Sequence, residues 1–338
     1  MLNDNRVVRP FEWGTEFVSG SANGHDPLEF LRRHAEESIA SSDRFFRLDA
    51  DPEYDESSPD PQAIEGSEYV SWTSAVETPS DVNNVAHARL FAHEKDKKAA
   101  VVVLPHWNAR EGSYLDLCTN FRRFGVSALR LTLPYHEERM PPELERADHL
   151  VSPNIGRTIQ SVRQSVLDTI AAVRWLYLKG YENVGVAGTS IGSCVAFLAF
   201  VHDETIKSAV FNHVSGYVSD VVWRGLSTYH VKEGLETGIS LEDLRECWKP
   251  ISPFAYMDKL AALPPRPQRY IYTLYDLSFP VDLSRSTMKA LNERGIEHDE
   301  TVIPCGHYTL GEKPWVYLDG YKIISFLRKT LRSTNNAH

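Results

Sequence analysis

The most telling segment of the chain reads Val184-Gly-Val-Ala-Gly188-Thr-Ser190-Ile-Gly192-Ser-Cys-Val-Ala-Phe-Leu-Ala-Phe200. A short apolar run leads into a G-x-S-x-G pentapeptide, and small and apolar residues follow as in the first turns of a buried helix. G-x-S-x-G between a strand and a helix is typical of a sharp turn that lifts the serine hydroxyl above a sheet. The flanking glycines leave out Cβ atoms that would meet the neighbouring strand and helix. We therefore expect Ser190 at a strand-to-helix turn, with its hydroxyl free to react.

The composition is that of a globular protein. Of the 338 residues, 42% are hydrophobic and 24% are charged, which are ordinary fractions for soluble domains. The length suits one large α/β domain with additions, or two ordinary domains. The formal net charge is −10, and the sequence has no run of lysine or arginine. We therefore expect no nucleic-acid partner.

The sequence predicts neither a membrane span nor a signal peptide. No apolar stretch approaches the roughly 20 residues that cross a bilayer. The N-terminal Met-Leu-Asn-Asp-Asn-Arg-Val-Val-Arg-Pro also lacks the apolar centre of a signal peptide. We therefore expect a cytoplasmic protein, whose oligomeric state the sequence leaves open.

The sequence gives no sign of a bound metal or cofactor. The four cysteines lack C-x-x-C spacing, which favours buried free thiols over disulfides or a zinc site; they are Cys118, Cys194, Cys247 and Cys305. The segment Tyr135-His136-Glu137-Glu138 is interpreted as a solvated loop, and its adjacent side chains cannot all face one ion. Neither G-x-x-x-x-G-K-S/T nor G-x-G-x-x-G occurs. We expect no cofactor and no metal.

Residues 1–66 are interpreted as an accessory segment before the main domain. Asp26 is a good N-cap for a helix that starts at Pro27, and apolar residues from Leu28 to Ile39 follow at helical spacing. The stretch 48–66 is acidic and rich in proline and serine, which predicts a solvated loop.

Residues 67–338 alternate strands and helices, which predicts a mostly parallel, doubly wound α/β sheet. The first two strands, over 69–76 and 86–92, have the alternating pattern of antiparallel strands near a sheet edge. The run 99–104 is continuously apolar, as in a central parallel strand. Further strands are expected over 126–133, 183–187, 207–212, 270–275 and 299–303, and helices over 113–124, 156–178, 281–293 and 315–331.

One connection is far longer than usual links between strands. It follows the sixth predicted strand, spans about residues 214–262 and contains aromatic residues such as Trp223 and Trp248. We interpret it as a helical, lid-like insertion that covers the site. Peripheral packing is the alternative.

Three motifs occur in this framework: Gly188-Thr-Ser190-Ile-Gly192, Tyr275-Asp276-Leu-Ser-Phe-Pro280 and Pro304-Cys-Gly306-His307-Tyr-Thr. Their order resembles the nucleophile, acid and histidine of the α/β-hydrolase superfamily. The resemblance covers about residues 69–331 and points to the serine esterase and dienelactone-hydrolase branches. It implies the α/β-hydrolase fold, with antiparallel N-terminal strands and a helical insertion.

The resemblance implies a role for one residue of each motif. Ser190 is the nucleophile, which needs a base within hydrogen-bond reach. His307 is that base and later the acid that protonates the leaving group. Asp276 orients the imidazole, and the nearest rivals for this role are Asp220 and Asp282.

An oxyanion hole needs two backbone N–H donors. Ile191, directly after the nucleophile, is expected to supply one. The other is expected from Pro105-His106-Trp107-Asn108, where the superfamily usually carries His-Gly and this chain does not. Trp107 is the first choice for this donor and His106 the second.

The function implied by these motifs is that of a cofactor-independent serine hydrolase. It would cleave small-molecule carboxylic esters through an acyl-enzyme. A peptidase, amidase or thioesterase would use the same three residues, so these activities remain alternatives. A hydrolase-like protein that binds a ligand without catalysis is a third possibility.

Overall fold

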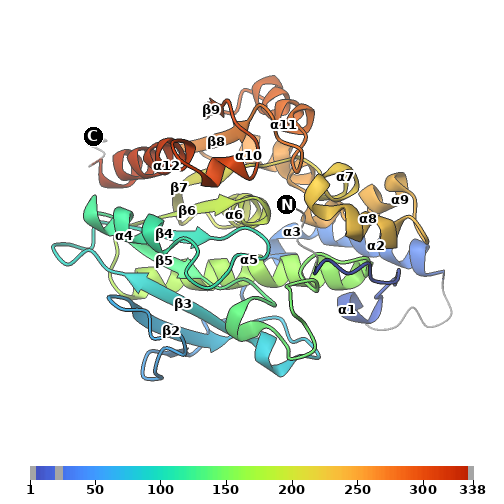
Figure 1. Ribbon diagram of the computed structural model, residues 1–338, viewed down its shortest axis with the longest axis horizontal. Helices are drawn as coiled ribbons and strands as arrows, with labels where there is room; N and C mark the ends of the chain where they lie inside the picture. The colour runs from blue at the N-terminus through green and yellow to red at the C-terminus, as the bar shows by residue number, and fades with distance from the viewer. Residues whose placement is uncertain (1–4, 20–25, 334–338) are drawn as a thin grey trace.

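A nine-stranded sheet runs through the centre of the protein (Figure 1). The computed structural model describes residues 5–19 and 26–333, in which the strand order is β1-β2-β3-β5-β4-β6-β7-β8-β9. The pairs β1–β2, β2–β3 and β3–β5 are antiparallel, and the other pairs are parallel. The strands are β1 (Tyr54–Asp55), β2 (Glu68–Thr73), β3 (Val85–Phe91), β4 (Ala99–Leu104), β5 (Ser127–Leu131), β6 (Asn183–Thr189), β7 (Ile206–Asn212), β8 (Gln268–Thr273) and β9 (Asp299–Ile303).

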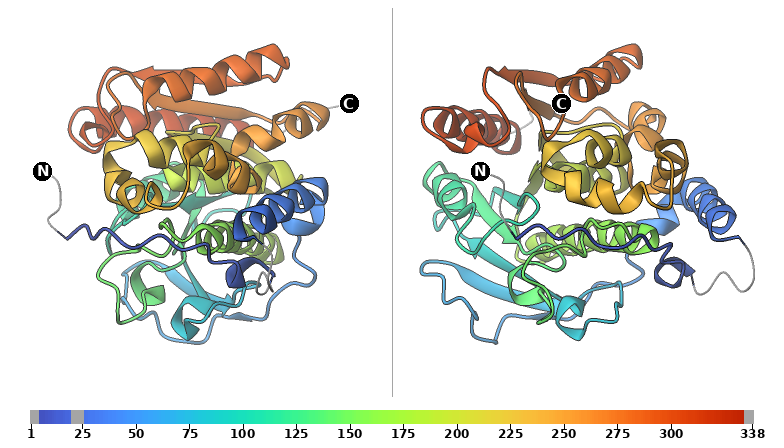
Figure 2. Two further views of the ribbon diagram at one scale, coloured as in Figure 1. Left: turned by 90° about the vertical axis from the view of Figure 1, so that its right-hand side faces the viewer. Right: turned by 45° about the vertical axis from the view of Figure 1, so that its right-hand side comes forward.

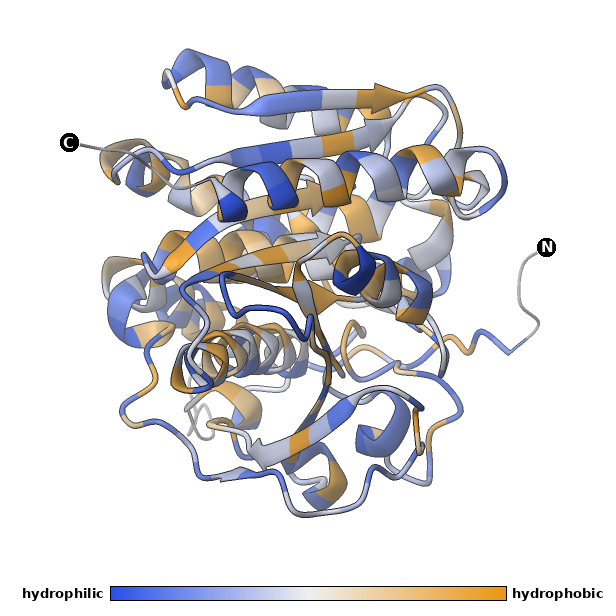
Figure 3. Ribbon diagram, turned by 90° about the vertical axis from the view of Figure 1, so that its left-hand side faces the viewer, coloured by the Kyte–Doolittle hydropathy of each residue, from blue (hydrophilic) through white to orange (hydrophobic). Residues whose placement is uncertain are grey.

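The central parallel strands are apolar because the sheet is covered on both faces. Every residue of β4 is buried, as expected of a strand between two layers of helices. Val102 and Leu104 belong to the larger hydrophobic core on one face, whereas Val101 and Val103 belong to the core on the other face. Figure 3 shows hydrophobic residues along the central strands and on the helices around them.

Helices form a layer on each side of the sheet (Figure 2). Residues of α5 (Ile155–Leu178), α6 (Ile191–His202) and α11 (Val281–Glu293) belong to the larger core. Residues of α4 (Leu115–Arg123) and α12 (Trp315–Arg332) belong to the core on the opposite face. The doubly wound α/β sheet is therefore confirmed.

The register brings the candidate site to one edge of the sheet. Leu104 at the end of β4 pairs with Gly188, and Thr189 at the end of β6 pairs with Asn212 of β7. The strands β8 and β9 continue the parallel order. The loops that follow these carboxyl ends therefore gather at the same edge.

The N-terminal segment contacts both the sheet and the insertion. It holds α1 (Glu16–Ser19), α2 (Pro27–Ala40) and α3 (Ser42–Phe45). As predicted, Asp26 caps α2, because its Oδ1 accepts a hydrogen bond from the Leu28 N–H at 2.8 Å. The helix α2 lies beside α9 (Leu241–Cys247) of the insertion.

The prediction of a solvated loop over residues 48–66 is confirmed for most of the stretch, in which Asp49, Asp51, Glu53 and Glu56 are exposed, but two short parts of it pair with the sheet. The strand β1 lies within it, so the insertion follows the seventh strand rather than the sixth. Asp60 accepts hydrogen bonds from the fully buried Arg89 of β3, at 2.6 Å from its Nη2. A cation inside an otherwise apolar strand needs a paired carboxylate, and the acidic segment supplies it.

The insertion is a group of short helices, drawn in yellow to orange in Figure 1. They are α7 (Val218–Arg224), α8 (Tyr229–Leu235), α9 (Leu241–Cys247) and α10 (Met257–Ala262). The other predicted strands and helices are confirmed, with ends that differ by a few residues, and the four cysteines are free and buried as predicted. Among the described residues, no helix is both long and apolar enough to cross a membrane.

The turn between β6 and α6 leaves no room for a side chain at Gly188. A Cβ atom there would lie 2.0 Å from the Gly192 carbonyl oxygen. We expect Gly188→Ala to lower the free energy of unfolding by about 3 kcal/mol or more, because backbone atoms must move. Urea denaturation measures this loss.

Gly320→Ala on α12 is the matched control. Nothing lies within 4 Å of its Cβ position, and alanine in a helix is about 1 kcal/mol more favourable than glycine. We expect this variant to be as stable as the wild type or slightly more stable. Equal stabilities for the two variants would contradict the close packing of the turn.

Candidate active site

Ser190 occupies a strained turn at the start of α6. Its φ of 58° and ψ of −122° lie outside the regions that residues with a Cβ atom usually adopt. Such backbone strain costs about 1–3 kcal/mol and persists only where the surroundings impose it. Here the Ser190 N–H donates to the Asn212 carbonyl at 2.8 Å, and the Ser190 carbonyl accepts from Ser193 Oγ at 2.6 Å.

Asp276 and His307 face each other from the loops after β8 and β9. His307 Nδ1 lies 2.9 Å from Asp276 Oδ2. Because a carboxylate only accepts, the imidazole donates through Nδ1, and its Nε2 is left for another partner. The backbone N–H groups of Ser278 and Phe279 donate to Asp276 Oδ1 at 2.8 and 2.7 Å. Burial opposes ionisation, but the donors and imidazoles around Asp276 hold the pKa of its carboxyl well below the usual range.

The Phe279 ring stacks on the His307 ring. The two rings are nearly parallel, at 4°, with centroids 5.5 Å apart. Phe279 also lines the same cavity as Ser190. The described residues give Ser190 Oγ no hydrogen bond, either to His307 or to another group. Such bonds are often loose before substrate binds, so this arrangement suits a free site.

The two rival carboxylates have other partners. Asp220 accepts hydrogen bonds from Arg245, at 2.6 Å from Nη2 and 2.9 Å from Nε. Asp282 pairs with Arg224 at 2.8 and 2.9 Å. Asp276 is the carboxylate that the structure joins to His307.

The first turn of α6 packs onto the loop after β4. A Cβ atom on Gly192 would lie 2.4 Å from the Leu104 carbonyl oxygen and 2.5 Å from that of Pro105. The backbone N–H groups of Ile191 and Trp107 donate no hydrogen bond to any described residue. Two backbone donors without a partner among the described residues thus lie on segments that touch.

His106 is the second predicted donor on this loop. Its backbone N–H is also unpaired among the described residues. Its ring is occupied, with Nδ1 at 2.8 Å from the Tyr114 hydroxyl. Burial lowers the pKa of His106 to about 4, so the ring is neutral near pH 7.

Side-chain hydrogen bonds hold the same loop in place. Trp107 Nε1 donates to the Ala147 carbonyl, and the Ala147 N–H donates to Asn108 Oδ1, both at 2.8 Å. The Asn108 N–H donates to His136 Nε2 at 2.8 Å. His136 therefore fixes the loop rather than facing solvent.

The prediction of a solvated loop at residues 135–138 is accordingly wrong. His136 is 3% exposed, and burial lowers its pKa to about 4. Glu137 accepts from Arg130 of β5 at 3.0 Å, and Glu138 pairs with Arg89 of β3. The sequence did carry a signal for these contacts. Arg89 and Arg130 lie within apolar strands, and a buried cation needs a carboxylate nearby.

Several solved structures share this architecture. A Pyrococcus horikoshii acylaminoacyl peptidase matches with a TM-score of 0.60 and 14% identity, over 75% of this chain and 41% of that one. A Mycobacterium tuberculosis puromycin-hydrolyzing peptidase matches with a TM-score of 0.55 and 16% identity, over 76% and 41%. A Pyrococcus furiosus esterase matches with a TM-score of 0.55 and 16% identity, over 83% and 99%.

The chain has the α/β-hydrolase fold. It spans about two fifths of the length of the two peptidases and nearly the whole length of the esterase. A scan against protein-family models finds no match, and a search of curated proteins finds none either.

In this α/β-hydrolase fold, a narrow apolar cavity adjoins Ser190. Its volume is about 50 Å³. The insertion supplies much of its wall, and no charged side chain lines it. The lining residues are Trp107, Val151, Ser190, Ile191, Cys194, Ser215, Val218, Val221, Val222, Ser227, Thr228 and Phe279.

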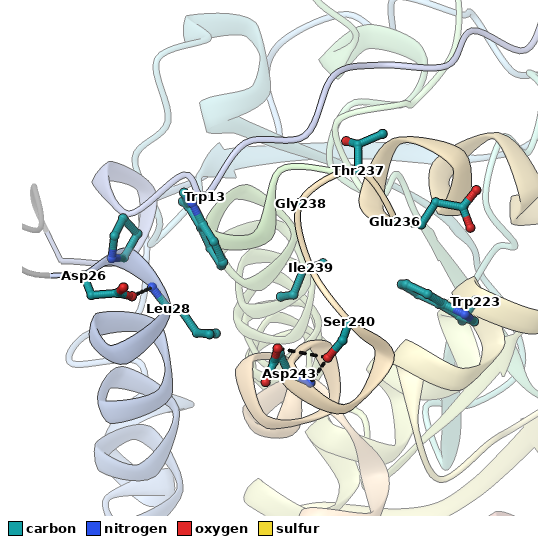
Figure 4. A pocket seen from close by; sticks show the side chains of 11 residues that line it. Trp13, Asp26, Leu28, Trp223, Glu236, Thr237, Gly238, Ile239, Ser240 and Asp243 are labelled. Atoms are coloured by element: carbon teal, nitrogen blue, oxygen red, sulfur yellow. Dashed lines mark hydrogen bonds between the residues drawn. The ribbon is translucent and has the colours of Figure 1, made fainter.

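A larger hollow lies elsewhere, between the N-terminal segment and the insertion (Figure 4). It is an open space of about 710 Å³, and Trp13 and Trp223 are among its lining residues. Neither Ser190 nor His307 lines it. Two of its carboxylates already have partners, because Asp26 caps α2 and Asp243 accepts from Ser240. This hollow is separate from the candidate active site.

The sequence reasoning did not find His213, which lies at the end of β7. Its Nδ1 lies 2.9 Å from Asp276 Oδ2, and its ring centroid lies 4.4 Å from that of His307. The donor atoms of these three residues lie within 4.8 Å of one another, a spacing that a metal ion could also use. One feature of the sequence could have indicated His213. This residue directly follows β7, and the last residue of the strand, Asn212, accepts the hydrogen bond of the Ser190 N–H.

Proposed function

We propose that this protein is a serine hydrolase that cleaves carboxylic esters through an acyl-enzyme. The observation that supports this proposal most directly is the 2.9 Å hydrogen bond between His307 Nδ1 and Asp276 Oδ2. It lies at the sheet edge where the backbone of Ser190 is strained. Cytoplasmic location and a small-molecule substrate remain predictions from the sequence.

In the proposed reaction, Ser190 Oγ attacks the ester carbonyl carbon and its proton passes to His307 Nε2. Asp276 holds the imidazole with Nε2 available and stabilises the positive charge that forms on the ring. The same proton then goes to the departing alcohol. In the second half of the cycle, water gives a proton to His307 and its oxygen bonds to the acyl carbon. The bond from that carbon to Ser190 Oγ then breaks, and the proton on His307 returns to Ser190 Oγ as the acid leaves.

The oxyanion would be bound by the N–H groups of Ile191 and Trp107, with His106 as the second choice on the loop. Their lack of other partners supports this assignment. The hydrogen bonds of Trp107 Nε1 and Asn108 support it as well, because donors that are already fixed need no rearrangement during the reaction.

The cavity beside Ser190 favours a small, uncharged acyl group. Its volume of about 50 Å³ is well below the roughly 300 Å³ at which drug-sized sites begin. Val218, Val221 and Val222 of α7 form much of its wall. We propose that residues 214–262 act as a lid and set this preference.

We expect Ser190→Ala to abolish turnover of p-nitrophenyl acetate, by roughly a thousandfold or more, because the attacking oxygen is removed. Mass spectrometry after treatment with a fluorophosphonate should locate the label on Ser190 in the wild type. Ser286→Ala is the control, since that hydroxyl bonds only to Leu283 within α11. Failure of the wild type to take up the probe would favour a protein that binds a ligand without catalysis.

We expect Asp276→Asn to lower kcat on the same ester by about a thousandfold or more, because an amide favours the wrong imidazole tautomer. Asp220→Asn should retain most of the activity, since Asp220 interacts with Arg245 and the Ser219 hydroxyl and not with His307. Steady-state kinetics of both variants measure the difference. The reverse order of effects would make Asp220 the acid.

A peptidase that removes acylated amino acids is the second candidate. The similarity to the Pyrococcus horikoshii acylaminoacyl peptidase favours it, although only two fifths of that chain is matched. Side-by-side assays of short-chain esters, thioesters and acyl-aminoacyl anilides distinguish the two functions. We expect kcat/KM for the ester to be highest by at least tenfold, because a cavity of about 50 Å³ fits a short acyl group better than an acylated amino acid. A higher value for the anilide would favour the peptidase.

A further inference from the structure

The proposed mechanism assigns no role to His213, whose imidazole lies beside Asp276 and His307. His213 is 1% exposed and has a φ of 60°, in the left-handed region that side chains seldom adopt. Its backbone is held there on both sides. The N–H donates to the Ile271 carbonyl at 2.8 Å, and the carbonyl accepts from Ser193 Oγ at 3.1 Å. Strain that the surroundings impose in this way is typical of functional sites.

The strained backbone directs the His213 ring at the carboxylate of Asp276. Its Nδ1 lies 2.9 Å from Asp276 Oδ2, the oxygen that also receives the His307 hydrogen bond. The approach is out of line with the ring N–H bond, so Nδ1 has no hydrogen-bond partner among the described residues. A buried polar atom without a partner requires a specific explanation.

The proton on His213 is fixed by elementary electrostatics. A bare nitrogen lone pair would be repelled by a carboxylate oxygen at 2.9 Å, so the proton belongs on Nδ1. Burial, together with the charge of His307, lowers the pKa of His213 to about 4. The ring is therefore neutral near pH 7 and places Nδ1–H, the positive end of its dipole, beside Asp276 Oδ2, although the N–H bond does not point straight at that oxygen.

We propose that His213 is a positioning residue that holds the Asp276 carboxylate in place for His307, a role that rests on the proposed hydrolase mechanism. As a neutral dipole, it shares the charge of Asp276 without repelling the imidazolium that forms on His307 during the reaction. Removing the dipole leaves Asp276 Oδ2 to interact with His307 and, at 3.3 Å, with the Thr273 hydroxyl. That change favours the protonated base and loosens the carboxylate.

The experiment compares His213→Asn with His213→Leu. The asparagine amide can place an N–H group where Nδ1 now lies, whereas leucine fills the space without a donor. We expect His213→Leu to lower kcat on p-nitrophenyl acetate by about tenfold or more at unchanged KM. The acidic limb of its kcat/KM profile should move up by about 0.5–1 pH unit. His213→Asn should keep the wild-type limb and most of kcat.

Other titratable groups around His307 require a control. They are Asp276, His213, His106 from the loop after β4, and beyond them Asp319 of α12. Burial raises the pKa of Asp319 to about 7, although the Asn212 amide donates to it. If titration of the Asp319 carboxyl contributes to the acidic limb of the kcat/KM profile, that contribution disappears in Asp319→Asn. A profile for His213→Leu that matches the wild type, or equal losses in both His213 variants, overturns the proposal.

A measurement on the wild type separates this proposal from the hydrolase function. Nitrogen-15 NMR of the histidine rings reports tautomer and charge without any substrate. We expect His213 to be neutral and protonated on Nδ1 between pH 6 and 8. A proton on Nε2, or a charged ring, rules out the positioning role even if the enzyme cleaves esters. The expected tautomer in a protein without esterase activity would leave the Asp276 contact intact and reject only the hydrolase function. This measurement also applies if the leucine variant fails to fold.

Discussion

The site depends on one close contact, the packing of the β6–α6 turn against the end of β4. Gly188 and Gly192 let backbone carbonyls lie where a Cβ atom would otherwise stand. The turn can then hold Ser190 in a strained conformation, with its N–H bonded to Asn212 of the next strand. The same contact sets Ile191 beside the loop after β4. The candidate nucleophile and the candidate oxyanion donors therefore share one rigid support.

Buried ion pairs support that loop from behind. Arg89 and Arg130 lie within apolar strands and are neutralised by carboxylates from two separate segments. One of these segments holds His136, which binds the Asn108 N–H; the other belongs to the N-terminal residues. Breaking such a pair leaves an unpaired charge in the core, which is strongly destabilising. The accessory segment thus contributes to the main domain rather than only preceding it.

The long periodic elements could be predicted because burial forces a pattern on the sequence. The apolar run of β4 and the stripe along α5 reflect contact with the cores on both faces of the sheet. The acidic stretch 48–66 is exposed over most of its length, as its composition predicts. Asp60 is the exception, because the buried Arg89 that pairs with it lies far away in the chain. A two-residue strand such as β1 carries too little periodicity to be recognised.

The same limit applies to the candidate site. The order of the three motifs resembles that of the α/β-hydrolase superfamily, and this resemblance singled out Ser190, Asp276 and His307 and placed them after strands of one sheet. The sequence could not show that Asp276 rather than Asp220 contacts His307, and it did not single out His213. Those distinctions depend on which side chains meet across β7, β8 and β9. Only the folded chain brings residues 213, 276 and 307 within hydrogen-bond range, since pairing between distant strands sets their distances.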